Sequence, residues 1–345
     1  MAIQELPLVL QTSYAELTDL LRAQTASDFP AGSTFRKREI SGKSYWYAQE
    51  PTGPQGRPPE RYLGPDTEEL AAAIERGQAA KADADARKAI IRSLKAAGLP
   101  EPDTLTAAIL EALAGAGVFR LRGVVVGTVA FQTYAGLLGV RLPGAAIRTG
   151  DVDIAQDYGV AVGIDDALET SFLDILRQVD KRFSPVPHIS SQTAATTYAR
   201  PGGYRVDVLT TNRGKDRDAP VTLPSLKTDA VPLRFLDFLL KETVQAAVLS
   251  KTGVLVNIPT PERYAVHKLI VSTLRHSVGE SAAKADKDVA QAATLIEAFS
   301  VKRRLNDFNE VLREAKKRGV GWRERLQTSA GRLPEEIRLL SKLLT

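Results

Sequence analysis

The 345-residue chain contains no cysteine and only three histidines, His188, His267 and His276. The absence of cysteine excludes disulfide bonds, zinc thiolate sites and thiol nucleophiles. The histidines lie far apart in the sequence, which disfavours a transition-metal site built on imidazole groups. Any catalytic metal is therefore expected on carboxylates, the ligands that Mg²⁺ takes in proteins.

Long hydrophobic runs are also missing. No apolar stretch reaches membrane-spanning length, and residues 1–10 lack the basic start, apolar stretch and cleavage site of a signal peptide. We therefore expect a cytoplasmic protein with no membrane contact. With 43% hydrophobic and 25% charged residues, the chain can bury a full-sized core, and its length predicts two or three domains.

Positive charge is unevenly distributed along the chain. The net charge is +5, but residues 34–63 carry six basic and three acidic residues, and residues 301–325 carry nine basic and four acidic residues. Such patches suit phosphate-rich partners. Because Lys and Arg are also ordinary surface residues, solvated basic faces are the alternative interpretation.

The N-terminal part combines helices with a short β-rich segment. Apolar residues at helical spacing predict a helix over residues 13–24. Residues 34–65 contain β-forming residues broken by Ser-Gly and Gly-Pro turns, which predicts a small antiparallel sheet. A polar, alanine-rich stretch then predicts a connecting helix up to Gly98, opened by a capping box of Asp66 and Glu69.

Four aromatic residues of the small sheet are interleaved with basic residues, and they admit two interpretations. A nucleic-acid platform uses rings for stacking and basic side chains for neutralising the backbone. Alternatively, the rings form the core of the small sheet itself. The four residues are Tyr45, Trp46, Tyr47 and Tyr62.

The central region has an order of elements that carries the functional hypothesis. The predicted order is a strand over 121–126, a Gly127-Thr128 turn, a helix over 129–138, a strand over 148–154, and a hairpin over 196–199 and 204–210. Further predicted elements are helices over 103–114 and 165–182, strands over 244–249 and 254–258, and C-terminal helices over 262–274, 282–299, 302–317 and 335–343.

These elements predict an α+β protein with three domains. Residues 1–98 are expected to form a basic N-terminal β module with its helices. Residues 99–259 are expected to form a core of a mixed sheet with helices, and residues 260–345 a helical C-terminal domain.

Three aspartates on predicted strands are candidate metal ligands. Asp151 and Asp153 are two residues apart and therefore share one face of their strand. If the strand of Asp207 lies beside theirs, three carboxylates meet at one place. Crowded carboxylates repel one another unless a cation lies between them, which makes a divalent metal the natural completion.

Gly127 and Thr128 are candidate phosphate-binding residues. A glycine lets backbone N–H groups approach an anion, and the helix that follows favours phosphate at its N-terminus. The threonine hydroxyl could add a hydrogen bond to a phosphate oxygen. Many strand-to-helix turns contain glycine for steric reasons alone, so the interpretation depends on the aspartates that follow.

The order of these motifs resembles the nucleotidyltransferase fold of the DNA polymerase β superfamily. More closely, the chain is similar to a bacterial nucleotidyltransferase-like family related to type IV abortive-infection toxins. The matching segments are residues 126–130, 148–154, 206–208, 261–269 and 287–288, together with the β-rich segment 35–65. The chain departs from the wider superfamily in having threonine after the glycine and a longer gap between Gly127 and Asp151.

This resemblance implies a role for each matching residue. Asp151 and Asp153 would bind two metal ions, Mg²⁺ or Mn²⁺, and Asp207 the catalytic one. The implied nucleotide-binding residues are Gly127, Thr128, Arg148, Thr149, Lys268 and Asp288. Lys268 and Asp288 could instead be solvated residues, Arg148 could be a loop-anchoring ion pair, and His267 is favoured as a packed or capping residue over a base.

The implied activity is metal-dependent transfer of a nucleoside monophosphate from a nucleoside triphosphate to an acceptor hydroxyl. An RNA acceptor, the 3′ end of tRNA in a toxin or defence role with an antitoxin partner, is the leading hypothesis. A protein or small-molecule acceptor is the second. A non-catalytic nucleic-acid-binding protein on the same fold is the alternative from another class.

Overall fold

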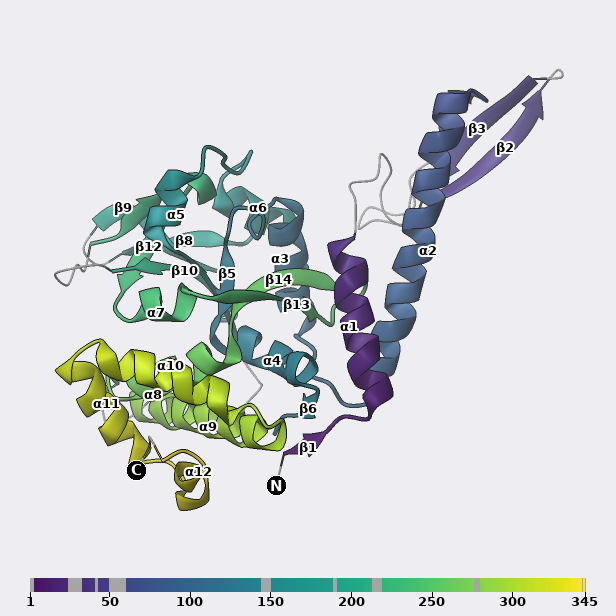
Figure 1. The fold of residues 1–345 in the computed structure, drawn as a ribbon. Helices are drawn as coiled ribbons and strands as arrows, with labels where there is room; N and C mark the ends of the chain where they lie inside the picture. Colours follow the sequence, from purple (N-terminus) through teal and green to yellow (C-terminus); the bar gives the residue numbers. More distant parts are fainter. Residues whose placement is uncertain are drawn as a thin grey trace.

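The computed structural model shows a body of sheets and helices from which one arm extends (Figure 1). It describes residues 3–23, 33–40, 43–49, 60–143, 150–188, 191–212, 219–275, 280–342 and 344. Arg148 and Thr149, two of the predicted nucleotide-binding residues, lie outside this part of the chain, and so does His276.

The arm consists of the long helix α2 (Glu68–Ala96) and a three-stranded antiparallel sheet at its outer end (Figure 1). The strands of this arm sheet are β2 (Thr34–Ile40), β3 (Lys43–Gln49) and β4 (Arg61–Pro65). At its inner end α2 packs on α1 (Leu8–Arg22). The predictions of a small sheet over residues 34–65 and of a connecting helix are both confirmed.

The start of α2 differs from the predicted one. Thr67 is the N-cap, because its hydroxyl accepts a hydrogen bond from the backbone N–H of Leu70 at 3.3 Å. Asp66, which the capping-box pattern favoured, accepts a hydrogen bond from the indole N–H of Trp46 at 2.7 Å. The carboxylate of Asp66 therefore binds Trp46 of the arm sheet instead of capping α2.

Seven strands form the central mixed sheet. The main path runs β11-β12-β10-β7-β5, β9 pairs with β10, and β8 pairs with β9. β10 is parallel to β7 and β12, whereas β5 is antiparallel to β7 and β9 is antiparallel to β10. The bounds are β5 (Val124–Val126), β7 (Asp151–Gln156), β8 (Ser184–His188), β9 (Ser191–Ala199), β10 (Arg205–Thr211), β11 (Val221–Leu223) and β12 (Thr228–Leu233).

Helices and one further hairpin surround this sheet. The helices are α3 (Thr104–Gly115), α4 (Gly127–Leu138), α5 (Tyr158–Gly163), α6 (Phe172–Val179) and α7 (Leu236–Leu240), with a 3₁₀ turn η2 (Pro224–Leu226). The predicted strands near residues 244 and 254 form an antiparallel hairpin, β13 (Thr243–Val248) and β14 (Val254–Pro259). Near the N-terminus, β1 (Gln4–Glu5) pairs with β6 (Val140–Arg141).

Two predicted elements are shorter in the structure. The strand expected from residue 121 begins only at Val124, because Arg122 has a φ of 65° and belongs to a turn. The helix expected over 165–182 is confined to α6, because the hydroxyl of Ser171 caps its first turn. Apolar periodicity predicted a strand and a helix in the right regions. It did not predict the turn at Arg122 or the cap at Ser171, where these elements begin.

Five helices form the C-terminal part. They are α8 (Pro261–Ser272), α9 (Glu280–Val301), α10 (Leu305–Lys317), α11 (Val320–Ala330) and α12 (Glu335–Leu339). The four predicted helices are present, and α11 is additional. α11 escaped prediction because its apolar positions are sparse: only Leu326, Ser329 and Ala330 are buried.

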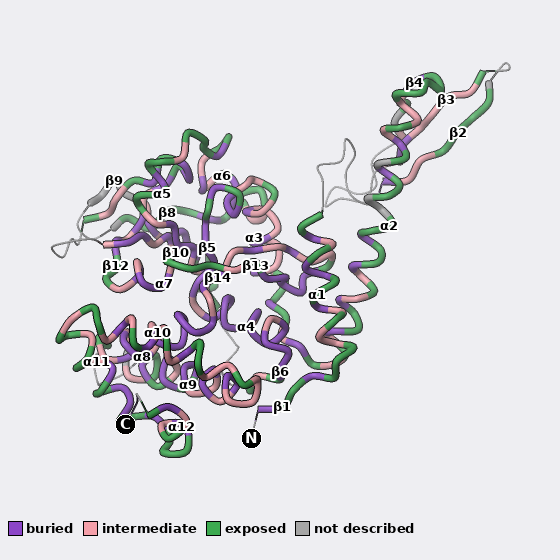
Figure 2. The backbone as a smooth tube through the Cα atoms, viewed as in Figure 1, coloured by how far each residue is buried: buried purple, intermediate pink, exposed green. Residues whose placement is uncertain are grey.

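The C-terminal helices share one hydrophobic core with the central sheet. Val125, Ile154 and Val206 of the sheet belong to the same buried cluster as Leu269 of α8 and Phe299 of α9. Figure 2 shows the buried backbone concentrated in the body, whereas the arm sheet is mostly exposed or intermediate. The boundary predicted between residues 259 and 260 stays a prediction, and the core runs across it.

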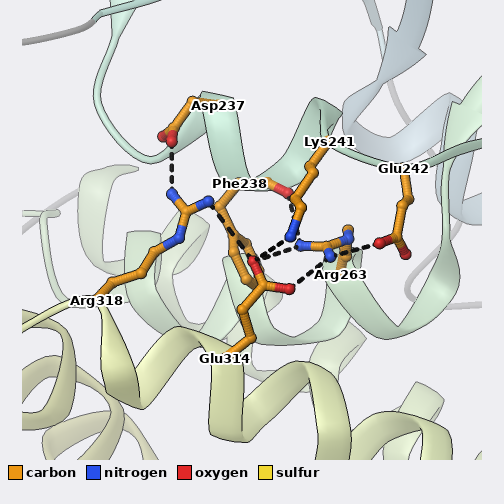
Figure 3. Close-up of polar contacts among 7 residues, drawn as sticks. All are labelled: Asp237, Phe238, Lys241, Glu242, Arg263, Glu314 and Arg318. Carbon is orange, nitrogen blue, oxygen red and sulfur yellow. Dashed lines mark hydrogen bonds and ion pairs between the residues drawn. The ribbon is translucent and has the colours of Figure 1, made fainter.

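An ion-pair network joins α7, α8 and α10 (Figure 3). At its centre is Arg263 of α8, whose side chain is only 1% exposed. Its guanidinium donates to Glu314 of α10 at 2.7 Å and to Glu242 at 2.8 Å, and also contacts the backbone oxygen of Phe238 at 3.3 Å. Lys241 adds a second ion pair to Glu314 at 3.1 Å. This network fixes α8 against the body.

The part of the chain that the structure describes has no helix with both the length and the apolar character needed to cross a membrane.

Candidate functional site

Two neighbouring strands bring the three predicted carboxylates together. Asp151 and Asp153 lie on one face of β7, while Val152 between them points to the other face and is fully buried. β10 lies beside β7 in parallel, and its Asp207 is directly opposite Asp153. The adjacency on which the metal hypothesis depended is therefore present.

The electrostatics of these aspartates show that they are crowded. Burial raises the pKa of Asp153 to about 7, and the charges of Asp151 and Asp207 add to this effect. Burial also raises the pKa of Asp207, with a smaller contribution from Asp151, although the hydroxyl of Thr197 opposes the shift by donating to Asp207 at 2.5 Å. A nearby cation would relieve this repulsion.

Gly127 lies against this triad at the junction of β5 and α4. Its φ is 65°, and a Cβ built on it would lie 2.1 Å from the Oδ2 atom of Asp153. Both facts favour glycine at this position, the first because L side chains rarely adopt this conformation and the second because an added Cβ would force the Asp153 carboxylate to move. The N-cap residue, Val126, supplies no side-chain hydrogen bond to the first turn of α4.

A cleft of about 460 Å³ opens beside the triad, a volume within the usual range for a small-molecule site. The central sheet and α7 form one wall of this cleft and α8 the other. Gly127 borders the cleft, its polar side chains are Asp153, Asp207, Arg234, Tyr264, His267, Lys268 and Arg275, and the apolar ones include Leu209, Val231, Leu233, Leu236, Leu239, Val271 and Leu274. Thr128 is buried next to Gly127 and is not among the described lining residues.

Lys268 and Asp288 meet at the α8 wall of the cleft. The ammonium group of Lys268 lies in the cleft lining, donates to Asp288 at 2.6 Å and sits 5.3 Å from the ring centre of Tyr264. The other carboxylate oxygen of Asp288 accepts from Arg275 at 2.7 Å. Asp288 is buried behind these cations, so it holds Lys268 and Arg275 at the cleft.

Two lysines of α9 also act on the triad, and they were not predicted as site residues. The charge of Lys284 lowers the pKa values of both Asp153 and Asp207. Burial lowers the pKa of Lys287, whereas the charges of Asp151 and Asp153 raise it. The two lysines are three residues apart and therefore share one face of the helix, but only the packing of α9 on α8 brings that face near the triad.

His267 is held neutral in the cleft wall. Burial and the neighbouring Lys268 lower its pKa to about 3. Its imidazole is therefore unprotonated at neutral pH and is too weak a base to accept a proton readily. This agrees with the sequence-based preference for a packed histidine.

The donor set fits a divalent cation. Among the described residues, no three His, Cys, Asp or Glu side chains are already grouped as metal ligands. The fit rests on chemistry instead: carboxylate oxygens are the preferred ligands of Mg²⁺ and Mn²⁺, and the pKa values of Asp153 and Asp207 are raised by burial first and by the neighbouring acids second, both of which a bound cation would offset.

Comparison with known families assigns this core. Residues 104–317, more than half of the chain, match a family model described as nucleotidyltransferase. The chain belongs to this nucleotidyltransferase family. No curated protein and no protein of solved structure matches it significantly. The match runs from α3 to the end of α10 and so includes all the described residues that line the cleft.

The protein is therefore a transferase, and its catalytic family is carried by the α+β core that the sequence predicted. The mixed sheet with its helices is confirmed as the core of the family. The arm lies before residue 104 and outside the family match.

Replacing Gly127 with alanine is expected to lower stability by about 1–3 kcal/mol, because the new methyl group strains the backbone and displaces Asp153. Transfer activity is expected to fall with it, since Asp153 is moved. Chemical denaturation and a transfer assay would measure both effects. Gly163→Ala, where nothing lies within 4 Å of the added carbon, is the control, and equal behaviour of the two variants would contradict the close approach.

Proposed function

We propose that this nucleotidyltransferase transfers a nucleoside monophosphate from a nucleoside triphosphate to an RNA hydroxyl with the help of a divalent metal. The observation that carries the proposal is the register of β7 and β10, which puts Asp207 opposite Asp153 on the face where Asp151 also lies. Gly127 borders the same cleft.

Asp151, Asp153 and Asp207 would hold Mg²⁺ or Mn²⁺. When bound, such an ion neutralises negative charge that develops on the transferring phosphoryl group. Asp207, whose pKa is raised by burial and whose carboxylate accepts a hydrogen bond from Thr197, would accept a proton from the acceptor hydroxyl.

The triphosphate would lie between the Gly127 turn beside the triad and the cations of the α8 wall. The uncapped first turn of α4 at Gly127 offers backbone N–H groups to phosphate. Lys268 and Arg275 lie on the facing wall, and Lys287 is close enough to the triad to interact with its charge. Cations on one wall and acids on the other suit a triphosphate bound together with its metal.

The apolar part of the cleft would hold the nucleobase. Leu209 and Val231 of the sheet, Leu236 and Leu239 of α7, and Val271 of α8 form a continuous apolar lining. Burying a base against such side chains gains hydrophobic and dispersion energy without selecting one base strongly. Arg234 follows Leu233 in the sequence and also lines the cleft, and it is the candidate for base selection.

An RNA acceptor, such as the 3′ end of tRNA in a toxin or defence role, is supported by the basic composition of residues 34–63 and 301–325. A toxin role would also require an antitoxin partner. A protein or small-molecule hydroxyl is the second acceptor class. The crowded triad favours catalysis over a non-catalytic scaffold, because buried carboxylates without a cation cost stability.

The proposal is tested by incubating the full-length protein with each α-labelled nucleoside triphosphate and Mg²⁺, together with total RNA or a protein extract. Label in RNA is the expected result, and it should disappear when the metal is chelated. Label in protein alone would reject the RNA acceptor. Absence of label in every pool, despite tight RNA binding, would favour the scaffold alternative.

Replacing Lys287 with alanine is expected to raise the KM for the nucleoside triphosphate about tenfold with a smaller change in kcat. The reason is that an ammonium group near the triad contributes roughly 1–2 kcal/mol to holding charged phosphates in a partly buried site. Steady-state kinetics measure the effect. Lys317→Ala, an exposed lysine near the end of α10, should leave KM unchanged, and an equal rise in both variants would indicate non-specific electrostatics.

A further inference from the structure

The arm sheet has one face against α2 and one face toward solvent. Ala48 is fully buried, and Gly64 lies so that an added Cβ would be 3.6 Å from Leu70 of α2, which marks the inner face. Because side chains alternate along a strand, Tyr45 and Tyr47 point to the outer face. The aromatic residues of this segment are therefore divided between two faces.

Three tyrosines form a continuous row on the outer face. Tyr47 of β3 lies opposite Tyr62 of β4, and their ring centres are 5.4 Å apart. The ring of Tyr45 is 6.1 Å from that of Tyr62. Tyr62 is 54% exposed, whereas Tyr45 and Tyr47 are half-buried. The ring of Tyr62 is therefore open to solvent, and the alternative of tyrosines buried as the core of the small sheet does not hold for this residue.

Basic side chains of β2 flank the row. Arg36 lies opposite Tyr47 and Arg38 opposite Tyr45, so both arginines are on the same face as the tyrosines, and both are exposed. The guanidinium of Arg38 is 4.7 Å from the ring centre of Tyr47 and also pairs with Glu60. The result is an exposed surface of rings and positive charge.

We infer that this tyrosine–arginine face, composed of Arg36, Arg38, Tyr45, Tyr47 and Tyr62, binds single-stranded RNA. The exposed ring of Tyr62 and the half-buried rings of Tyr45 and Tyr47 beside it offer stacking surfaces to unpaired bases, and the arginines complement the charge of the backbone. A duplex keeps its bases stacked inside and cannot use the rings in this way. The choice of RNA rests on the proposed function, since RNA is the acceptor proposed there.

The position of this face sets what it can do for the reaction. α2 has 29 residues, which at about 1.5 Å per residue gives a length of roughly 43 Å. The arm sheet, which carries the tyrosine–arginine face, lies at the outer end of α2 (Figure 1). The residues that line the cleft belong to the central sheet, α7 and α8 of the body. The face therefore holds an RNA far from its reacting end, and it selects acceptors by length or by a distant single-stranded segment.

The test is RNA binding by the full-length protein without any nucleotide. Fluorescence anisotropy would use a labelled, unstructured 20-nucleotide RNA, the DNA strand of the same sequence, and the RNA in a duplex. Tyr62→Ala is expected to raise the Kd for the single strand about tenfold, within the effect of losing one stacked base. Tyr62→Phe keeps the ring and should bind like the wild type.

A matched control is Tyr158→Ala, which removes a tyrosine of α5 that is 43% exposed on the body. It should leave RNA affinity unchanged. The paired variant Arg36→Ala and Arg38→Ala should also weaken binding and should reduce its salt dependence. Circular dichroism and thermal unfolding would verify that each variant is folded.

The outcomes separate this inference from the proposed function. Unchanged affinity in Tyr62→Ala and in the arginine variant, or tighter binding of the duplex or of DNA than of single-stranded RNA, would overturn the inference even if transfer to RNA is observed. Loss of RNA affinity in these variants would support it even if the wild type transferred no nucleotide, a result that would reject only the proposed function.

Discussion

Replacing Asp153 with alanine is expected to lower the rate of nucleotidyl transfer by more than about 10³-fold. Asp153 lies opposite Asp207 and beside Asp151, so its removal breaks the centre of the proposed metal-binding group. Loss of a single electrostatic contact to the transition state typically costs about 10² to 10³ in rate, and loss of a metal costs more.

The same substitution is expected to leave the fold intact. The stability of the metal-free protein should be unchanged or higher, because burial and the two other acids already disfavour the charged form of Asp153. RNA binding should persist with its usual salt dependence, since the basic surfaces are untouched.

Transfer activity, free energy of unfolding and RNA affinity should therefore be measured together for Asp153→Ala. Asp165→Ala, which removes an exposed aspartate of the same core, is the matched control and should keep full activity. Equal transfer by Asp153→Ala and the wild type would discard the triad as the catalytic group. A simultaneous loss of activity and of folding would assign Asp153 a structural role instead.

Replacing Glu314 with alanine is expected to lower the free energy of unfolding by about 1–3 kcal/mol. The reason is Arg263, which is 1% exposed and would lose its partner at 2.7 Å, keeping Glu242 as its remaining carboxylate partner at 2.8 Å (Figure 3). Removing one carboxylate from a buried arginine leaves part of its charge uncompensated, and this costs more than the ion pair contributes to stability.

The pH dependence of stability follows from the pKa of Glu314. Burial tends to raise this pKa, but the hydrogen bonds from Arg263 and Lys241 prevail and lower it to about 2. A carboxyl whose pKa is lower in the folded state stabilises the fold above its unfolded value, near 4.5, and this contribution is lost as the pH falls toward 2. The wild type should lose this contribution in acid, and Glu314→Ala should not.

Urea denaturation at pH 7 and at pH 3 would measure both effects. Glu310→Ala, an exposed glutamate on the same helix, should change stability by less than about 0.5 kcal/mol. The double variant Arg263→Met with Glu314→Leu should be more stable than Glu314→Ala, because it leaves no buried charge. A cost below about 1 kcal/mol for Glu314→Ala would mean that the network adds little.

Local patterns were sufficient for most of the elements. β-forming residues and turn signals predicted the arm sheet and the β9–β10 hairpin. Apolar periodicity predicted four of the C-terminal helices, because burial on one face leaves a repeat of about 3.6 residues in the sequence, but it missed α11, where few side chains are buried. The capping-box pattern misplaced the start of α2, because the carboxylate of Asp66 accepts a hydrogen bond from Trp46 of β3.

Part of the candidate site was also predictable from local patterns, and part depended on tertiary contacts. The spacing of Asp151 and Asp153 already fixed that they share a face, since alternation along a strand is local. Their position beside Asp207 depended on the pairing of β7 with β10, which are separated along the chain by α5, α6 and two strands. Lys284 and Lys287 reach the triad only because α9 packs on α8, and no local pattern carries that information.

The sequence by itself determined the element types, the acidic motif and the glycine turn, because each depends on backbone preferences and on side chains a few residues apart. Only the tertiary structure decided which residues border the cleft, that Asp288 is buried behind Lys268 and holds it at the cleft, and that Tyr62 of the arm is exposed to solvent. These features arise from burial and pairing between segments far apart in the chain. Such contacts are selected by the packing free energy of the whole core, so they cannot be predicted from a short segment of the sequence.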